Sequence, residues 1–353
     1  MQSKSLISLL LSSLFLISCA KSSSDYPVVI FNDTDVKELF SIYSIDHEIQ
    51  LEGMIGLNDD YTKMIIFDSD YYIFTRSDQK VHRFNRNGAK VTEYGNLGGG
   101  PGEYIVADDF LIDINNGNIE ILSDISKKIF IYDSESNFLE SKPIIGNPYQ
   151  FAKLNDGTYI FAKGPVRDSV NNLNTAQIYR TDGVGNILDK SLEVENNALI
   201  HPMPDNSIQY SNGRYYYKYW FSTYVYDITD KEPVIVAEVD FGGRNLNEKM
   251  LRDGNSMDDL MNFMMELEDF YVINRYLEND SFIYLYITGN KSYHLIYDKK
   301  IEKTDTFPGS TELSRVRGAL HLTKDNKLIF LEEKDDSNLI IQIDLLGKRG
   351  VSL

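Results

Sequence analysis

An apolar strand that ends in Asp or Asn recurs along this chain and constrains its fold more than any other feature. The six copies are Val81–Asn85, Ile129–Asp133, Ile178–Asp182, Tyr224–Asp227, Leu295–Asp298 and Ile340–Asp344. Each copy has the alternation of a β-strand, and its last residue can accept hydrogen bonds from the turn that follows. The recurrence therefore predicts a fold built from one repeated sheet module.

Each copy lies within a longer unit of short strands that are separated by turn residues such as Asn87-Gly88 and Asn212-Gly213. Asn-Gly between two strands is the strongest short signal for a β-hairpin. The units are about Tyr61–Tyr94, Tyr104–Lys142, Tyr149–Leu192, Ser207–Phe241, Asp269–Phe307 and Val316–Leu346. Their starts lie roughly 40 to 60 residues apart, the range of propeller blades with two enlarged loops.

The chain is therefore predicted to be all-β, a six-bladed β-propeller of four-stranded antiparallel blades. One blade cannot bury both of its faces, so stacking blades around an axis creates the core. A strand near Phe40–Leu51 is expected to complete the sixth blade, because a ring that joins its two ends has no open edge to aggregate. The earlier strand Val28–Phe31 has no evident full unit around it.

One insert, near residues 245–270, has the pattern of a helix instead of a strand. Its apolar residues fall on one helical face and are Met257, Leu260, Met261, Met264 and Leu267. This face is expected to pack over the rim of the propeller, and a lid or a Met-rich partner groove is the alternative. Exposure of Met261 and Met264 would favour the alternative.

The N-terminus carries an export signal. Lys4 precedes an apolar stretch, Leu6–Ile17, that is too short to span a bilayer. Leu16-Ile17-Ser18-Cys19 follows and resembles a bacterial lipobox, so residues 1–18 are predicted to be a lipoprotein signal peptide. Lipidated Cys19 would then anchor the protein to a membrane through a flexible tether, residues 19–27, with one propeller domain at 28–353.

A glycine-rich loop joins the first two units. Its expected structural positions are Gly98, Gly100, Pro101, Gly102, Glu103 and Tyr104. Together with Asp109-Phe110, Asp124 and Tyr132-Asp133, this segment resembles the six-bladed β-propeller lipoproteins of Gram-negative anaerobes, which are distant relatives of the NHL-repeat and TolB-like propellers. The resemblance is best over Asp70–Lys142. It implies the fold and the compartment. Because no acidic run of the kind that resembles surface-export signals follows Cys19, the protein is expected on the periplasmic face of the outer membrane, with the cell surface as the alternative.

Composition and motifs exclude several kinds of chemistry. The formal charge of −18 disfavours nucleic acid as a partner, because such binding needs a basic patch. The glycine-rich loop lacks the Gly-Lys-Ser/Thr of a phosphate-binding loop, and no G-x-S-x-G or H-E-x-x-H motif is present. No cofactor, metal site or catalytic residue is predicted. The histidines are expected to be packed or surface residues and are His47, His82, His201, His294 and His321.

An aromatic run, residues 215–221, is the best candidate for ligand contact. In a strand, Tyr216 and Trp220 lie on one face, and Tyr215, Tyr217 and Tyr219 lie on the other. Both faces can pack between blades. If Tyr216 or Trp220 is exposed near the channel mouth, its ring could stack on a sugar or a peptide.

These features favour a membrane-anchored, non-catalytic binding or scaffold protein of the cell envelope, with a protein or glycan partner. The alternatives are a propeller enzyme, such as a lyase, lactonase or glycan hydrolase with a site in the central channel, and a purely structural subunit of an envelope assembly. A tightly bound divalent metal or hydrolysis of glycans or lactones would favour the enzyme. Co-purification with one fixed partner would favour the structural subunit.

Overall fold

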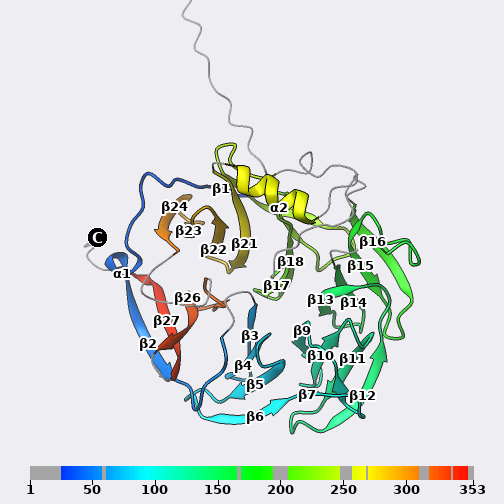
Figure 1. Cartoon of the computed structure of the whole chain (residues 1–353). Coiled ribbons are helices and arrows are strands. Elements are labelled where there is room, and N and C mark those ends of the chain that lie inside the picture. Colours follow the sequence, from blue (N-terminus) through cyan, green and yellow to red (C-terminus); the bar gives the residue numbers. More distant parts are fainter. Residues whose placement is uncertain are drawn as a thin grey trace, which may run out of the picture.

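A computed structural model describes residues 25–57, 61–164, 168–193, 206–246, 257–267, 269–309, 318–334 and 337–348. Its strands form small sheets arranged around a central axis (Figure 1). Six of these sheets are blades, each with four antiparallel strands, so the predicted all-β six-bladed propeller is confirmed. The predicted signal peptide and Cys19 lie outside the described residues.

We number the blades I to VI along the chain and call their strands A to D from the axis outwards. Blade I contains β3 (Thr62–Phe67), β4 (Asp70–Thr75), β5 (Lys80–Phe84) and β6 (Lys90–Tyr94). Blade II contains β9 (Asp109–Ile112), β10 (Ile119–Ser123), β11 (Lys128–Tyr132) and β12 (Phe138–Pro143). Blade III contains β13 (Pro148–Lys153), β14 (Tyr159–Lys163), β15 (Ala176–Thr181) and β16 (Ile187–Glu193).

Blade IV contains β17 (Ile208–Ser211), β18 (Arg214–Lys218), β19 (Tyr224–Asp227) and β20 (Val234–Asp240). Blade V contains β21 (Tyr271–Glu278), β22 (Phe282–Gly289), β23 (Tyr293–Asp298) and β24 (Lys303–Pro308). Blade VI contains β25 (His321–Leu322), β26 (Lys327–Lys334), β27 (Ser337–Lys348) and, as its outermost strand, β2 (Tyr43–Gln50). Strand β2 pairs antiparallel with β27, which confirms the predicted closure by a strand near Phe40–Leu51.

The core consists of clusters of buried side chains that lie between successive blades. The cluster between blades I and II, for example, joins Tyr72 and Phe74 to Phe110 and Ile121. Comparable clusters join each of the other neighbouring pairs, including blades VI and I, where Ile49 of β2 takes part. The inner strands of a blade are covered on both faces and are therefore nearly all apolar, as in β10. The outermost strands, such as β12, carry many polar residues.

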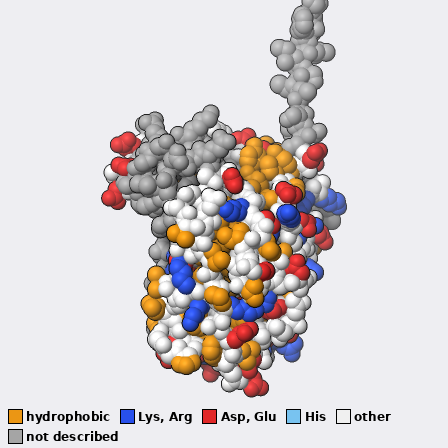
Figure 2. Space-filling model, turned by 90° about the vertical axis from the view of Figure 1, so that its right-hand side faces the viewer, with side chains coloured by type: hydrophobic (Ala, Val, Ile, Leu, Met, Phe, Trp, Pro, Cys, Tyr) orange, Lys and Arg blue, Asp and Glu red, His pale blue; other side chains and the backbone are white. Residues whose placement is uncertain are grey.

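In the part of the face in Figure 2 that is coloured by residue type, hydrophobic side chains lie in groups among charged ones. Exposed apolar residues of the outer strands include Leu139 and Leu188. Scattered apolar residues of this kind are normal for a folded protein.

The N-terminal segment forms a strap across three blades before it closes the ring (Figure 1). Strand β1 (Val28–Ile30) adds a fifth strand to blade IV by pairing parallel with β20. The chain next forms a parallel bridge between Val36 and Thr306 of blade V, and then a short helix, α1 (Leu39–Ile42), leads into β2. The sequence indicated β1 as a strand but not its partner.

The predicted helical insert contains helix α2 (Met257–Glu266), in the connection between β20 and β21. Met264 and Leu267 are partly buried against the cluster between blades III and IV, as expected for a helix that packs on the rim. The side chain of Met261 lies outside the part of the chain that the structure describes.

The glycine-rich loop connects β6 to β9 and contains two short strands, β7 (Asn96–Leu97) and β8 (Glu103–Tyr104), which pair parallel. The Glu103 carboxylate accepts the Gly100 N–H at 2.7 Å, and the buried Tyr104 hydroxyl donates to the carbonyl oxygen of Gln79. The Gly102 carbonyl oxygen accepts the Tyr132 hydroxyl at 2.6 Å. The loop therefore fixes the junction of blades I and II and has a structural role.

We expect Gly102→Ala to lower the free energy of unfolding by about 2 to 4 kcal/mol, because left-handed backbone is unfavourable for alanine and the new methyl group overpacks the site. Gly102 has φ of +75°, and a Cβ there would lie 2.6 Å from the Phe138 ring. Denaturant unfolding measures the change. Gly99→Ala is the matched control, since a Cβ there meets nothing within 4 Å, and its effect should stay within about 0.5 kcal/mol. Equal effects of the two substitutions would contradict this role for the loop.

Candidate functional site

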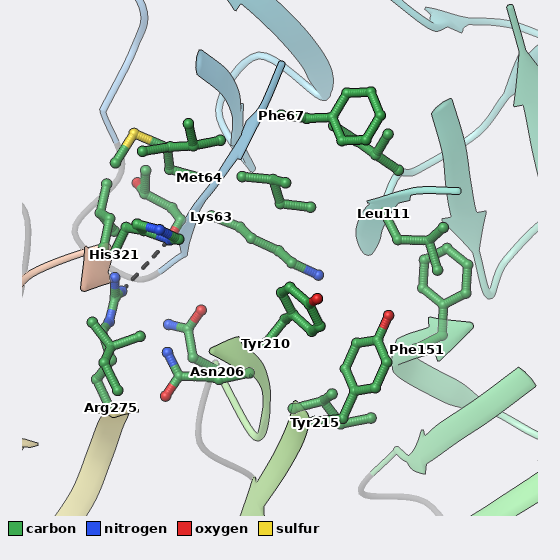
Figure 3. A pocket seen from close by; sticks show the side chains of 18 of the residues that line it. Lys63, Met64, Phe67, Leu111, Phe151, Asn206, Tyr210, Tyr215, Arg275 and His321 are labelled. Atoms are coloured by element: carbon green, nitrogen blue, oxygen red, sulfur yellow. Dashed lines mark hydrogen bonds between the residues drawn. The ribbon is translucent and has the colours of Figure 1, made fainter. Parts of the chain in front are cut away.

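The central channel is lined mainly by the A strands, which are β3, β9, β13, β17, β21 and β25 (Figure 3). It encloses a cavity of about 120 Å³, several times the 10 to 15 Å³ or so that one water molecule needs. Most of the lining side chains are apolar, including Met64, Leu111, Phe151 and Leu277. Apolar lining with a few polar groups is typical of small-molecule or side-chain binding sites.

A repeated hydrogen bond joins successive blades beside the channel. The Asp109 carboxylate accepts the backbone N–H of Phe151 at 3.1 Å. In the same way, the Gln150 side-chain oxygen accepts the N–H of Ile208 at 3.0 Å, and that of Gln209 accepts the N–H of Tyr276 at 2.6 Å. We call Asp109, Gln150 and Gln209 the A-strand acceptors. Each satisfies a main-chain donor on the A strand of the following blade.

Two cationic side chains extend this ring of contacts around the channel. The Lys63 ammonium group of blade I donates to Asp109 Oδ1 at 2.8 Å and to the carbonyl oxygen of Phe110 at 2.7 Å. Arg275 of blade V donates to the carbonyl oxygen of Ala319 at 3.1 Å and, over 3.5 Å, to that of Thr62 (Figure 3). These contacts link blade I to blade II, and blade V to blades VI and I.

Asp109 is the electrostatic centre of the ring and is 0% exposed. Besides Lys63 and Phe151 it accepts a hydrogen bond from the Tyr61 hydroxyl at 2.7 Å. Burial, and then the Asp109 charge, raises the pKa of Tyr61 well above its usual value, so this hydroxyl stays protonated. A buried carboxylate with this set of donors is a structural group, because both of its oxygens already accept hydrogen bonds from neighbouring blades or strands.

At the end of the channel where the A strands turn into the B strands, the lining is apolar and open to solvent. Ile114 is 50% exposed and Tyr210 is 45% exposed, and both line the cavity together with Phe67. The Tyr210 and Tyr215 rings lie against each other with centroids 5.0 Å apart, and the Tyr215 hydroxyl donates to the carbonyl oxygen of Lys153. We call Phe67, Ile114, Tyr210 and Tyr215 the mouth.

The predicted stacking residues lie elsewhere. Tyr216 is only 1% exposed, its hydroxyl donates to Glu278 at 2.6 Å, and its ring packs on Tyr276. Its ring is therefore not available to a ligand, because it is packed in the cluster between blades IV and V. Trp220 is partly buried against the cluster between blades III and IV, and a ligand role for it stays a prediction. Sequence reasoning missed Tyr210 and Tyr215, whose aromatic cross-strand pairing was the available signal.

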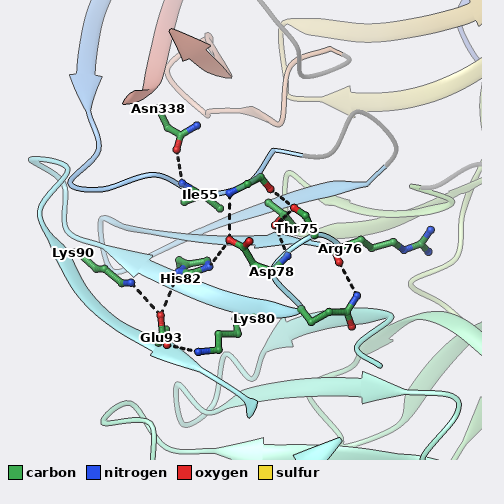
Figure 4. Close-up of polar contacts among 12 residues, drawn as sticks. Ile55, Thr75, Arg76, Asp78, Lys80, His82, Lys90, Glu93 and Asn338 are labelled. Carbon is green, nitrogen blue, oxygen red and sulfur yellow. Dashed lines mark hydrogen bonds and ion pairs between the residues drawn. The ribbon is translucent and has the colours of Figure 1, made fainter. Parts of the chain in front are cut away.

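A cluster of polar contacts connects the residues that precede β3 of blade I with blades I and VI (Figure 4). The Asp78 carboxylate contacts His82 Nε2 at 3.1 Å and accepts the N–H of Gly56 at 3.3 Å, and Asn338 accepts the N–H of Ile55 at 2.6 Å. Burial lowers the pKa of His82, although Asp78 opposes this change. The neighbouring Ser77 hydroxyl donates to the carbonyl oxygen of Gly56 and not to the imidazole, so the cluster lacks the geometry of a nucleophile and its base.

The remaining histidines do not converge either. His321 lines the channel and His294 lies in β23, while His47 is exposed on β2 and His201 falls outside the described residues. Within the described ranges no group of three or more His, Cys, Asp or Glu side chains could hold a metal ion. No helix in those ranges is long and apolar enough to cross a bilayer.

The comparisons with known proteins give a family and a fold. A family model described as "Domain of unknown function (DUF4934)" matches residues 52–341, so the chain belongs to this family. No curated protein matches the sequence. The likeness to NHL-repeat and TolB-like propellers stays a prediction.

Two solved structures are similar over most of their length. One, from Bacteroides fragilis, is described as a "Putative exported protein"; it is 18% identical, with 89% of this chain and 99% of that chain covered and a TM-score of 0.74. The other is a DUF4221 family member from Bacteroides vulgatus, which is 9% identical with 86% and 97% covered and a TM-score of 0.59. At these identities the likeness shows the fold alone.

We expect acid to destabilise the fold partly through His294. This side chain is 1% exposed, and burial lowers its pKa to about 4. The imidazole is enclosed by other side chains, and its Nδ1 lies 2.8 Å from the Tyr284 hydroxyl, which also accepts the N–H of Ala319. An unfolded histidine has a pKa of about 6.5, so protonation favours the unfolded chain, and the stability present above pH 6.5 or so is lost as the pH falls towards about 4.

Unfolding free energies at pH 7 and pH 5 measure this effect. When the pH falls from 7 to 5, the unfolding free energy of His294→Gln should fall by about 2 kcal/mol less than that of the unsubstituted protein. His47→Gln, at an exposed position, is the control and should leave the pH dependence unchanged. An unaltered pH dependence in His294→Gln would contradict the proposed neutral, buried imidazole.

Proposed function

We propose that this member of the DUF4934 family is a non-catalytic binding protein of the cell envelope, which holds a protein or glycan partner at the mouth of its channel. The observation that carries the proposal is the half-exposed apolar rim formed by Ile114 and Tyr210 over a cavity. Removing exposed apolar side chains of a concave site from water is favourable in free energy, so a partner that covers them is stabilised there.

The groups that could perform chemistry in the channel are used for structure instead. The Lys63 ammonium group and the Asp109 carboxylate pair with each other and with main-chain groups of the neighbouring blades. Burial lowers the pKa of His321 to about 4, so it is neutral at physiological pH and carries no charge for a ligand. This arrangement supports binding over the alternative of a lyase, lactonase or glycan hydrolase.

The location is proposed from the N-terminal sequence. The lipobox at Leu16–Cys19 supports lipidation of Cys19 and an outer-membrane anchor, and the similar Bacteroides fragilis structure is described as a "Putative exported protein". We place the propeller on the periplasmic side, because no acidic run follows Cys19 of the kind that resembles surface-export signals. The described strap begins at Asp25, a few residues after the anchor.

A pull-down from cross-linked membranes tests both parts of the proposal. The anchored protein should fractionate with membranes and capture a defined partner, whereas Cys19→Ser should be released into the soluble fraction. The double variant Ile114→Asn with Tyr210→Ser removes the apolar rim without a change of charge. Its affinity for the partner should be lower by at least about tenfold, or roughly 1.4 kcal/mol of binding free energy.

The matched control is Ile125→Asn with Leu188→Ser, which alters two equally exposed apolar residues away from the mouth. It should capture the partner as the unsubstituted protein does. Equal capture by the mouth variant and the control would refute the binding site, and a Cys19→Ser protein that stays with the membrane would refute the lipid anchor.

A further inference from the structure

We propose that the partner at the mouth is a basic peptide segment, one apolar side chain of which enters the channel while flanking Lys or Arg residues contact the surrounding turns. This inference rests on the proposed function and names the chemistry of its partner. It is carried by the cavity and its apolar rim, and the charge around that rim selects the occupant.

The cavity at the mouth accepts an apolar group. Phe67, Ile114 and Tyr210 come from blades I, II and IV, so the apolar rim spans a large part of the ring. Figure 3 shows Phe67 and the two tyrosines from separate strands around one space. An apolar side chain that enters between these rim residues is removed from water, which is favourable.

The turns between strands A and B surround this rim and are rich in carboxylates. Asp68, Asp156, Asp280 and Asp325 are exposed at the turns of blades I, III, V and VI. Lys327 pairs with Asp46 at 2.8 Å and lies 3.8 Å from Asp325, so Asp325 is partly neutralised. Lys324 is exposed in the same turn, and Lys299, which contacts the carbonyl oxygen of Asn279 beside Asp280, pairs with Glu278 at 3.5 Å. Arg214 of blade IV is already paired with Asp227. The described A–B turns therefore present an excess of negative charge.

Two of these carboxylates, Asp156 and Asp280, accept hydrogen bonds from uncharged donors, which fix their position without cancelling their charge. The Asp156 carboxylate accepts the backbone N–H of Thr158 at 2.9 Å, and this and the Thr158 side chain lower the pKa of Asp156. The Asp280 carboxylate accepts the Asn212 side-chain amide at 3.1 Å. Both carboxylates are therefore held in position before a partner arrives.

Contacts between the turns make the rim a fixed surface. The Asn115 amide of blade II reaches the carbonyl oxygen of Asn155 in blade III at 3.5 Å, and the Asn279 amide of blade V reaches Thr323 and Asn326 of blade VI at 2.8 and 3.0 Å. A preformed surface loses less conformational entropy on binding than a flexible one does.

These features together select a cationic partner with an apolar tip. A Lys or Arg within one Debye length of the rim, about 10 Å at 0.1 M salt, is attracted to it, and an acidic segment is repelled. A neutral glycan would gain nothing from the rim charge. The formal charge of −18 for the whole chain acts in the same direction at longer range.

Fluorescence anisotropy with three labelled peptides tests the inference on the purified soluble Cys19→Ser protein. The probes are the capped peptides KKFKK, EEFEE and KKGKK. We expect KKFKK to bind at least about tenfold more tightly than either of the others at 0.05 M salt or so, and more weakly at about 0.5 M salt, because salt screens exposed charges.

Charge-neutral variants locate the binding. The triple variant Asp68→Asn, Asp156→Asn and Asp280→Asn keeps the side-chain shape and one acceptor oxygen at each position, and it should weaken KKFKK binding at least about fivefold, or roughly 1 kcal/mol. The matched control neutralises the exposed Glu140, Asp258 and Glu266, which lie on β12 and α2. It has the same net charge and should bind KKFKK as before. Circular dichroism and thermal unfolding confirm that each variant is folded.

The outcomes separate this inference from the proposed function. Equal binding of EEFEE and KKFKK, no peptide binding, equal loss in the control triple, or capture of a glycan at the mouth would overturn the basic-peptide inference. If the neutral mouth variant nevertheless loses its envelope partner, the proposed function stands without it. If the mouth variant keeps that partner, the proposed function fails as well.

Discussion

The hydrogen bonds that the A-strand acceptors receive from the next blade are the interaction on which the ring depends. The A strand of every blade is an edge strand, so main-chain groups on its open side need partners or an aggregation-prone edge remains. Asp109, Gln150 and Gln209 supply such partners to Phe151, Ile208 and Tyr276 in the following blade. These bonds join blades II to III, III to IV and IV to V beside the channel.

The apolar clusters between blades and the closure by β2 complete this arrangement. Each cluster is shared by two blades, so losing one blade would expose the apolar surface of both neighbours. The N-terminal strap adds β1 to blade IV, contacts blade V through Val36 and then closes blade VI. Residues near the start of the chain are thus held by residues far along it, and any pull on the proposed anchor would act on this strap.

The sequence predicts the repeat well because a β-strand has a strict period of two and its turns have strong residue preferences. Asn212-Gly213 is a hairpin turn between β17 and β18, and residues 43–50 close the ring, as expected. These features depend on local patterns and on the need to remove sheet edges. The same logic assigned the glycine-rich loop to the junction of two blades.

The candidate site could not be read in the same way. Alternation shows that a strand has two faces but not which neighbour each face meets, so the sequence leaves open whether Tyr216 is exposed or packed between blades, and the structure shows that it is buried. Tyr210 and Tyr215 meet only when β17 and β18 pair beside the channel. Gln150 and Gln209 carry no motif, because their role depends on the position of the next blade and not on neighbours in sequence.

Native-state hydrogen exchange of three backbone amides tests the ring of cross-blade acceptors most directly. The amides of Phe151, Ile208 and Tyr276 should be protected to nearly the same degree as amides in the middle of their sheets, and they should exchange only through large-scale opening. Exchange of these three amides at the rate of exposed turns, while the rest of each sheet stays protected, would contradict the account.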